Sequence, residues 1–315
     1  MMDRRTFIGR VLGGLIAAPL AVHAQQPVKI RRIGFLREGR KPFAQPLLDA
    51  LRELGWVEGQ NFKVEPRYAE NADHLPELAT ELVRLKVDLI VTAGTPAALA
   101  AKAATATIPI VFSIANDPVE RELVASMRRP GGNLTGFALG LYGDKQLEVL
   151  KAALPRISRV AYPVFAGVTP PTLNAAKTLG LQMLPIAVQN PAEFSSFFAS
   201  ARAAGADAVL IPDVARLVPH LERIATEASK SGLPAVGFRR DFADAGGLLS
   251  YAPVLLEMNA RQAAQIDKIL RGVKPAELPI EQSARFELVV NLRSAKALGL
   301  TIPQSLLLRA DEVIQ

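Results

Sequence analysis

Short apolar runs alternate with segments of helical periodicity along the chain from about residue 30 onwards. The runs are rich in Val, Ile and Leu and are bounded by Gly, Pro, Asn or Asp, as is typical of buried strands. Strands are predicted at residues 32–36, 61–68, 87–92, 108–113, 134–137, 160–164, 184–188, 208–211, 235–238 and 248–251. Helical periodicity predicts helices at residues 47–54, 75–85, 143–154, 171–179 and 194–201. An alanine-rich helix is predicted to begin at Pro96, with Thr95 as its N-cap. This alternation indicates parallel sheets with right-handed crossovers.

The strand–helix pattern restarts after the helix predicted at residues 143–154, so we expect two α/β lobes. The chain has 315 residues, which is long for one core and suits two domains of ordinary size. Aromatic residues make up only 6% of the chain, so we expect cores built from Leu, Val, Ile and Ala. In such an architecture a ligand binds outside the carboxyl ends of the strands, in the cleft between the lobes.

The first 24 residues have the order of a secretory signal peptide. Arginines come first, an apolar run follows from residue 11 to 22, and Val22-His23-Ala24 precedes Gln25. We therefore expect cleavage after about Ala24 and a periplasmic mature protein. The apolar run is too short to span a bilayer comfortably. The Arg4-Arg5 pair leaves the twin-arginine route open beside the ordinary secretory route.

Charge and cysteine content exclude several classes of function. Without the leader, 34 basic and 29 acidic residues remain, and they are scattered rather than gathered in a basic stripe. This distribution does not favour nucleic-acid binding. The chain has no cysteine, which excludes disulfides, a thiolate nucleophile and a lipid-anchored cysteine.

No constellation of catalytic residues stands out. The sequence lacks a Gly-x-Ser-x-Gly elbow and the glycine-rich loops that hold phosphates. His74 and His220 are the only histidines after the leader, and neither lies in a cluster spaced for a metal. We therefore predict no catalytic residue, no metal site and no cofactor.

Polar and aromatic residues that follow strands are better candidates for contacts to a ligand. Backbone N–H groups at the start of the helix after Gly94 would favour a carboxylate, although Thr95 could equally cap this helix. Asp117 could face the cleft or cap the next helix, and Asp213 could accept hydrogen bonds from an ammonium group or lie in an ordinary loop. The ligand-binding residues predicted from these strand ends are Leu36, Gly94, Thr95, Pro96, Ala97, Asn116, Asp117, Phe165, Asp213, Phe238 and Arg239.

Several blocks, in order, carry a family resemblance. They are residues 54–61 (LGWVEGQN), 75–105, 108–112 (IPIVF), 117–119, 129–136 (RPGGNLTG), 245–251 (AGGLLSY), 286–291 (FELVVN) and 298–314. With these blocks the chain resembles the exported solute-binding proteins of ABC transporters, in the group related to tryptophan-binding components. The resemblance runs from Ile33 to the C-terminus.

The resemblance implies a type I periplasmic-binding fold, two Rossmann-like lobes joined by hinge strands. A helix at about residues 257–270 would return to the first lobe, and the strand at 286–291 would cross to the second. The lobes would then comprise residues 30–136 with 252–283, and 137–251 with 284–315. The implied function is capture of an amino acid or similar carboxylate for a permease in the inner membrane, by a monomer without catalytic activity.

The chain departs from the family pattern at four places. The first helix is about a turn short, and the segment after Val164 is shortened. Ala252 follows Tyr251 where glycine is usual, and Glu120 follows Asp117-Pro118-Val119 in place of a glycine. The first two changes reshape the cleft walls. Two alternatives stay open: a sensory subunit that reports to a membrane receptor, and an exported enzyme on the same scaffold.

Overall fold

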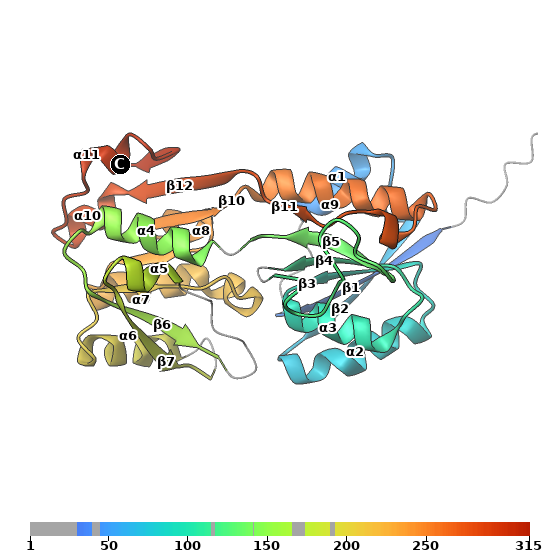
Figure 1. Cartoon of the computed structure of the whole chain (residues 1–315), viewed down its shortest axis with the longest axis horizontal. Coiled ribbons are helices and arrows are strands. Elements are labelled where there is room, and N and C mark those ends of the chain that lie inside the picture. The colour runs from blue at the N-terminus through green and yellow to red at the C-terminus, as the bar shows by residue number, and fades with distance from the viewer. Residues whose placement is uncertain (1–29, 40–44, 115–116, 141, 166–173, 190–192) are drawn as a thin grey trace, which may run out of the picture.

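The computed structural model describes residues 30–39, 45–114, 117–140, 142–165, 174–189 and 193–315. Two lobes lie side by side, each with its own sheet (Figure 1). The expected leader lies outside the described residues. Within them, no helix is long and apolar enough to cross a membrane.

The first sheet has six strands in the order β11-β5-β4-β3-β1-β2, and all of its paired strands are parallel. Its strands are β1 (Arg31–Glu38), β2 (Phe62–Ala69), β3 (Leu89–Ala93), β4 (Ile110–Ile114), β5 (Leu134–Ala138) and β11 (Glu281–Gln282). Its helices are α1 (Gln45–Glu53), α2 (Leu75–Arg84), α3 (Thr95–Ala104) and α9 (Leu255–Leu270). Helices α2 and α3 contribute to the core on one face of the sheet, and α1 and α9 to the core on the other.

The second sheet has seven strands in the order β13-β12-β10-β9-β8-β6-β7, with one antiparallel pair, β10 and β12. Its strands are β6 (Arg159–Val164), β7 (Gln182–Ala187), β8 (Ala208–Leu210), β9 (Ala235–Gly237), β10 (Leu249–Pro253), β12 (Phe286–Asn291) and β13 (Glu312–Ile314). Its helices are α4 (Gly143–Ala153), α5 (Asn174–Thr178), α6 (Phe194–Ala203), α7 (Leu221–Ser231), α8 (Arg240–Asp244), α10 (Leu292–Ala297) and α11 (Gln304–Leu307). Short 3-10 turns, among them η3 (Ala215–His220), complete the lobes.

The chain passes between the lobes three times. It leaves the first sheet after β5, returns between β10 and α9, and crosses again between β11 and β12 (Figure 1). Helix α9 packs on α1, β4 and β5, and β12 pairs with β10 and β13 in the second sheet. The expected α/β fold with two mostly parallel sheets is confirmed.

Aromatic side chains contribute more to the cores than the composition suggests. Aliphatic residues are the more numerous, but the largest fully buried side chains include Phe35, Phe62, Phe112, Phe137, Phe194, Phe197, Phe198, Phe238 and Phe242. In the second lobe the rings of Phe194, Phe197 and Phe198 contact one another at centroid distances of 5.1–6.3 Å. The cores are therefore built mainly from Leu, Val, Ile and Ala, as expected, but with phenylalanines that the expectation left out. A few large rings fill the space between a sheet and its helices, and composition alone does not reveal this.

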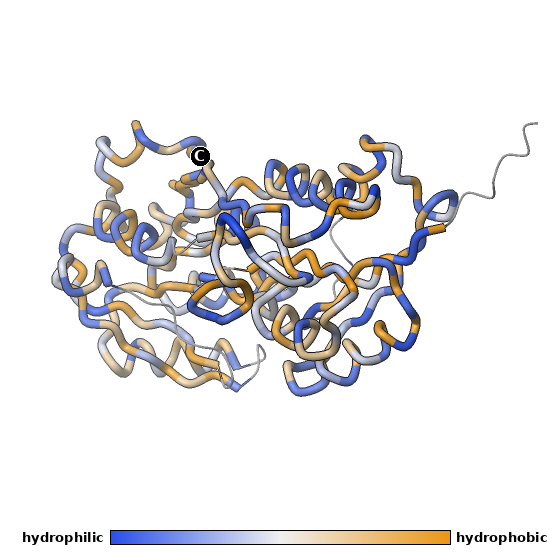
Figure 2. Tube along the Cα trace, turned by 45° about the vertical axis from the view of Figure 1, so that its right-hand side comes forward, coloured by the Kyte–Doolittle hydropathy of each residue, from blue (hydrophilic) through white to orange (hydrophobic). Residues whose placement is uncertain are grey.

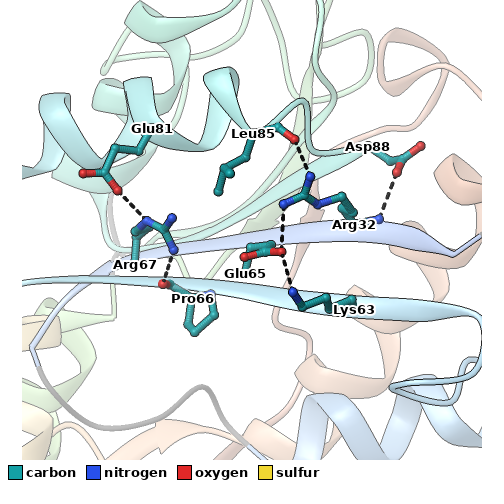
Figure 3. Close-up of polar contacts among 8 residues, drawn as sticks. All are labelled: Arg32, Lys63, Glu65, Pro66, Arg67, Glu81, Leu85 and Asp88. Carbon is teal, nitrogen blue, oxygen red and sulfur yellow. Dashed lines mark hydrogen bonds and ion pairs between the residues drawn. The ribbon is translucent and has the colours of Figure 1, made fainter.

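The outer strand β2 carries an alternation of charged and apolar residues. Phe62 and Val64 contribute to the core beneath α1 and α9, whereas Glu65 and Arg67 lie on the other face. Glu65 Oε1 accepts hydrogen bonds or ion pairs from Arg32 at 2.9 Å and from Lys63 at 3.2 Å (Figure 3). Charges along an edge strand oppose pairing with another chain. Along the helices of both lobes, hydrophobic and hydrophilic positions alternate in the same way (Figure 2).

Candidate functional site between the lobes

Of the residues predicted to contact a ligand, Leu36 lies within β1, and the others follow β3 and β4 of the first sheet or β6, β8 and β9 of the second. The two lobes approach each other where β1 ends. The position that a Cβ on Gly39 would occupy lies 3.8 Å from Pro219 Cγ of η3. Residues at the carboxyl end of β1 therefore lie near the second lobe.

Asp213, which follows β8, is held by a tyrosine that the sequence analysis did not single out. The hydroxyl of Tyr142 donates to Asp213 Oδ2 at 2.6 Å. Burial raises the pKa of the Asp213 carboxyl, and the Tyr142 hydroxyl and the positive charge of Arg239 partly offset this shift. Burial and the charge of Asp213 raise the pKa of Tyr142 well above its ordinary value. One oxygen of Asp213 is therefore engaged within the protein, which reduces its capacity to bind an ammonium group.

Arg239 and Arg37 bring positive charge to this region from different lobes. Arg37 is the penultimate residue of β1 and is buried, and its register partner on β2 is Tyr68. Burial lowers the pKa of Arg37, Tyr68 opposes the shift, and the positive charge of Arg239 lowers the pKa further. The two guanidinium groups are therefore close enough to repel each other.

The segment that carries Arg239 is fixed by close packing behind it. Gln146 of α4 donates from Nε2 to the carbonyl oxygens of Gly237 at 2.9 Å and Tyr251 at 3.1 Å. The ring of Phe242 occupies the space beside two glycines: a Cβ on Gly237 would lie 2.4 Å from the ring, and one on Gly247 would lie 2.1 Å from it. These contacts hold the end of β9 against α8, so the backbone of Arg239 has little freedom.

The turn between β3 and α3 differs from the prediction. Gly94, with φ +92°, is the N-cap, and Thr95 and Pro96 are the first two residues of the helix. The N-cap is therefore Gly94 and not Thr95. Glycine suits this place because it adopts a positive φ readily. The N–H of Gly94 donates to Ser113 O at 2.8 Å, and Pro96 has none. This helix start therefore offers fewer N–H groups to a carboxylate than expected, and Ala97 is buried in the core.

The loop after β4 contains two predicted contacts, Asn116 and Asp117. Asn116 lies outside the described residues. Asp117 is half-buried, and its Oδ1 accepts the N–H groups of Val119 at 2.7 Å and Glu120 at 3.3 Å. This oxygen therefore caps a turn, not a helix.

The three apolar candidates are packed inside the protein. Leu36, Phe165 and Phe238 are each at most 2% exposed. Leu36 belongs to the core of the first lobe, whereas both phenylalanines belong to that of the second. In this conformation they support the surrounding loops from within the cores. Their contact with a ligand stays a prediction.

The residues that sequence reasoning missed are Arg37, Tyr68 and Tyr142. Arg37 directly follows the apolar run of β1, and a charged residue at that place is a signal that the sequence does contain. Tyr142 precedes α4 and gives no such signal, because its partner Asp213 is 71 positions away. Among the described residues, no group of three or more His, Asp or Glu side chains is placed to hold a metal ion.

Comparison with known proteins identifies relatives over nearly the whole chain. A tyrosine-binding protein of Clostridioides difficile (strain R20291) is 25% identical over 260 residues, which cover 80% of this chain and 75% of that protein. The ABC domain from Streptococcus pneumonia in complex with L-Trp has a TM-score of 0.79 at 25% identity, covering 91% of this chain and 100% of that chain. A conserved domain protein from Vibrio cholerae has a TM-score of 0.82 at 25% identity, covering 90% and 100%.

The profile of one family matches residues 37–314. This range contains both sheets except for the first residues of β1. The profile describes substrate-binding proteins; the name of one relative states that it binds tyrosine, and another was solved in complex with L-Trp. Proteins with this role act outside the cytoplasm, beside a permease that receives their ligand. The chain belongs to the family of ABC transporter substrate-binding proteins.

Proposed function

We propose that this protein captures a small organic solute, an amino acid or a related carboxylate, between its lobes and delivers it to a permease in the inner membrane. One observation carries the proposal: Arg37 of the first lobe lies within electrostatic reach of Arg239 of the second, which in turn neighbours the hydrogen-bonded pair of Tyr142 and Asp213. Charged and hydrogen-bonding groups that converge in this way suit a small polar ligand. The names of two relatives, which bind tyrosine and tryptophan, are consistent with a carboxylate ligand.

The proposed scheme uses the three crossings as a hinge. The lobes, residues 30–136 with 252–283 and 137–251 with 284–315, open to admit the solute and close around it. Solute binding drives closure because the closed state makes more contacts to the solute. The closed form then docks on the permease. The protein acts as a periplasmic monomer that is exported with cleavage after about Ala24, binds no nucleic acid and catalyses no reaction.

The predicted contacts keep their place in this proposal, with additions. Gly94, Thr95, Pro96, Ala97, Asn116 and Asp117 would line the first lobe, and Phe165, Asp213, Phe238 and Arg239 the second. Leu36 would support the end of β1. The half-buried Gly94, Thr95, Pro96, Asp117, Asp213 and Arg239 have surface to offer a ligand. Arg37 and Tyr142, both buried in this conformation, are added to the set of proposed contacts.

Thermal shift measurements on the mature chain, residues 25–315, test the proposal against a library of amino acids and small carboxylates. A ligand at about 100 times its Kd stabilises the folded state by about 2.7 kcal/mol. We expect one chemical class to raise the melting temperature in proportion to the logarithm of its concentration, and calorimetry to give one site per chain. If no amino acid and no carboxylate stabilises the protein, the proposed function is wrong.

A further inference from the structure

The charges between the lobes bear on the class of solute. Arg37 and Arg239 come from different lobes. Burial lowers the pKa of Arg37, and the positive charge of Arg239 lowers it further. Arg37 is the penultimate residue of β1, and Arg239 lies two residues after β9. The lobes meet near Arg37, because a Cβ on Gly39 would lie 3.8 Å from Pro219 Cγ of η3. Two positive charges from different lobes therefore lie in the proposed binding region.

Arg239 has an incomplete set of partners. Its Nε is buried and has no hydrogen-bond partner among the described residues. Asp241 Oδ2 lies 3.5 Å from this atom, outside hydrogen-bond geometry, and the side chain of Asp241 is 58% exposed. An ion pair with an exposed carboxylate contributes little. A buried N–H donor without a partner lowers the stability of the protein, so the guanidinium of Arg239 is suited to donate to a further anionic group.

Arg37 donates its hydrogen bond to a neutral oxygen and not to a carboxylate. Its Nε donates to the backbone carbonyl of Glu38 at 3.2 Å. The side chain of Glu38 lies on the opposite face of β1, because successive residues of a strand alternate and Leu36 contributes to the core beneath α2 and α3. Among the described residues, no ion pair joins Arg37 to a carboxylate.

The carboxylates nearby do not balance the two arginines. Asp213 supplies one negative charge, and its Oδ2 is taken by Tyr142. Asp117 uses Oδ1 to cap its own turn. Asp241 pairs with Arg239 at 3.5 Å, but its side chain is 58% exposed and remains in water. The less exposed groups, Arg37, Arg239 and Asp213, therefore carry an excess of one positive charge. Closing the lobes removes this charge from water, which is unfavourable unless the solute itself brings a negative charge.

We infer that the solute is a net anion, an organic acid whose carboxylate lies between the guanidinium groups of Arg37 and Arg239. This inference rests on the proposed function and narrows it. A zwitterionic amino acid brings no net charge and leaves the excess in place, whereas an organic acid neutralises it. Arginine also suits this role, because its planar fork of N–H groups matches a carboxylate. The same anion shields the two arginines from each other and so couples binding to closure.

Calorimetry with three matched pairs of solutes tests the inference. The pairs are indole-3-propionate with L-tryptophan, 3-(4-hydroxyphenyl)propionate with L-tyrosine, and 4-methylpentanoate with L-leucine. In each pair only the α-ammonium group differs. We expect at least one acid to bind at least about tenfold more tightly than its amino acid, because the amino acid leaves a buried charge unpaired.

Arginine variants locate the anion. Truncating one partner of a buried charge pair weakens binding by about thirtyfold or more. We expect R239Q to lose this much affinity for the acid, R239K to recover part of it, and R37Q to lose a similar amount. Arg52, an exposed residue of α1 paired with Asp49, provides the matched control, and R52Q should bind as the unmodified protein does. Circular dichroism confirms that each variant is folded before its affinity is measured.

The outcomes separate the inference from the proposed function. If an amino acid binds more tightly than its acid in every pair that binds, or if R239Q and R37Q bind unchanged, the inference is wrong and the proposed function stands. If none of the six solutes binds and the wider library also fails, both are wrong. Tighter binding of an acid, lost in R239Q and retained in R52Q, supports both.

Discussion

The hydrogen bond between Tyr142 and Asp213 offers a quantitative test of the site's electrostatics. Tyr142→Phe removes the hydroxyl that donates to Asp213 Oδ2 at 2.6 Å and keeps the ring. The ring of residue 142 can still pack against Phe286, whose centroid lies 5.6 Å away. The substitution therefore isolates one hydrogen bond without creating a cavity.

A hydrogen bond to a charged group contributes about 1.5–3 kcal/mol to stability. Asp213 is half-buried, so we expect the lower part of this range, about 1.5–2 kcal/mol at pH 7. The loss depends on pH. Because the folded state raises the pKa of Asp213, stability falls as pH rises from the ordinary pKa of aspartate to the raised value. Removing the hydroxyl raises that pKa further, so the variant loses most above this window and less at acidic pH, where Asp213 is protonated.

Urea denaturation at pH 7 and at pH 4 measures this difference. Circular dichroism follows both lobes, and fluorescence of Trp56, the only tryptophan, follows the first lobe, where its Nε1 donates to Asp267 of α9 at 2.8 Å. The control is Tyr162→Phe in β6, where the hydroxyl has no hydrogen bond within the described part of the chain. A loss below about 0.5 kcal/mol at pH 7, or an equal loss at both pH values, would refute the reasoning.

Three further substitutions test the surrounding structure. Gly237→Ala should destabilise the protein by about 2–3 kcal/mol in urea denaturation, because its Cβ would lie 2.4 Å from the ring of Phe242; an unchanged midpoint would contradict this packing. Gln146→Leu should lower the free energy of unfolding by about 1–3 kcal/mol, since the carbonyls of Gly237 and Tyr251 lose a buried donor. It should also weaken solute binding in calorimetry, because the end of β9 is displaced. Glu65→Gln should reduce stability by at most about 1 kcal/mol at pH 7. Because hydrogen bonds from its arginine and lysine partners hold the pKa of Glu65 low, the unmodified protein should lose this contribution as pH falls below about 4, and the variant should not.

The fold could be predicted from the sequence because it depends on repeated local patterns. The alternation of buried strands and amphipathic helices indicated two parallel sheets, and the family blocks indicated the return of α9 to the first sheet. Short elements were missed where the local pattern is too brief: α8 has five residues and β11 has two. Their positions depend on tertiary contacts, such as the ring of Phe242 beside Gly237 and Gly247.

The candidate site was only partly predictable, for a physical reason. Asp213 and Arg239 were found because they follow strands, and strand ends are visible in a sequence. Arg37 directly follows the predicted strand, which ends at Leu36, two residues before β1 ends, and it was passed over in favour of Leu36. Tyr142 was missed because its role depends on a contact with Asp213 in another part of the chain. Phe165 and Phe238 were singled out by the same strand-end rule, yet they are buried in the core, since sequence position does not show where a side chain points.

The central claim is that this substrate-binding protein holds a small carboxylate between its lobes. A crystal structure of the mature protein, purified from cells without denaturation so that the solute remains bound, tests it most directly. We predict electron density for one small molecule between the lobes, with a carboxylate within hydrogen-bond distance of both Arg37 and Arg239. Closed lobes with no solute between them, or a solute whose acidic group contacts neither arginine, would contradict the account.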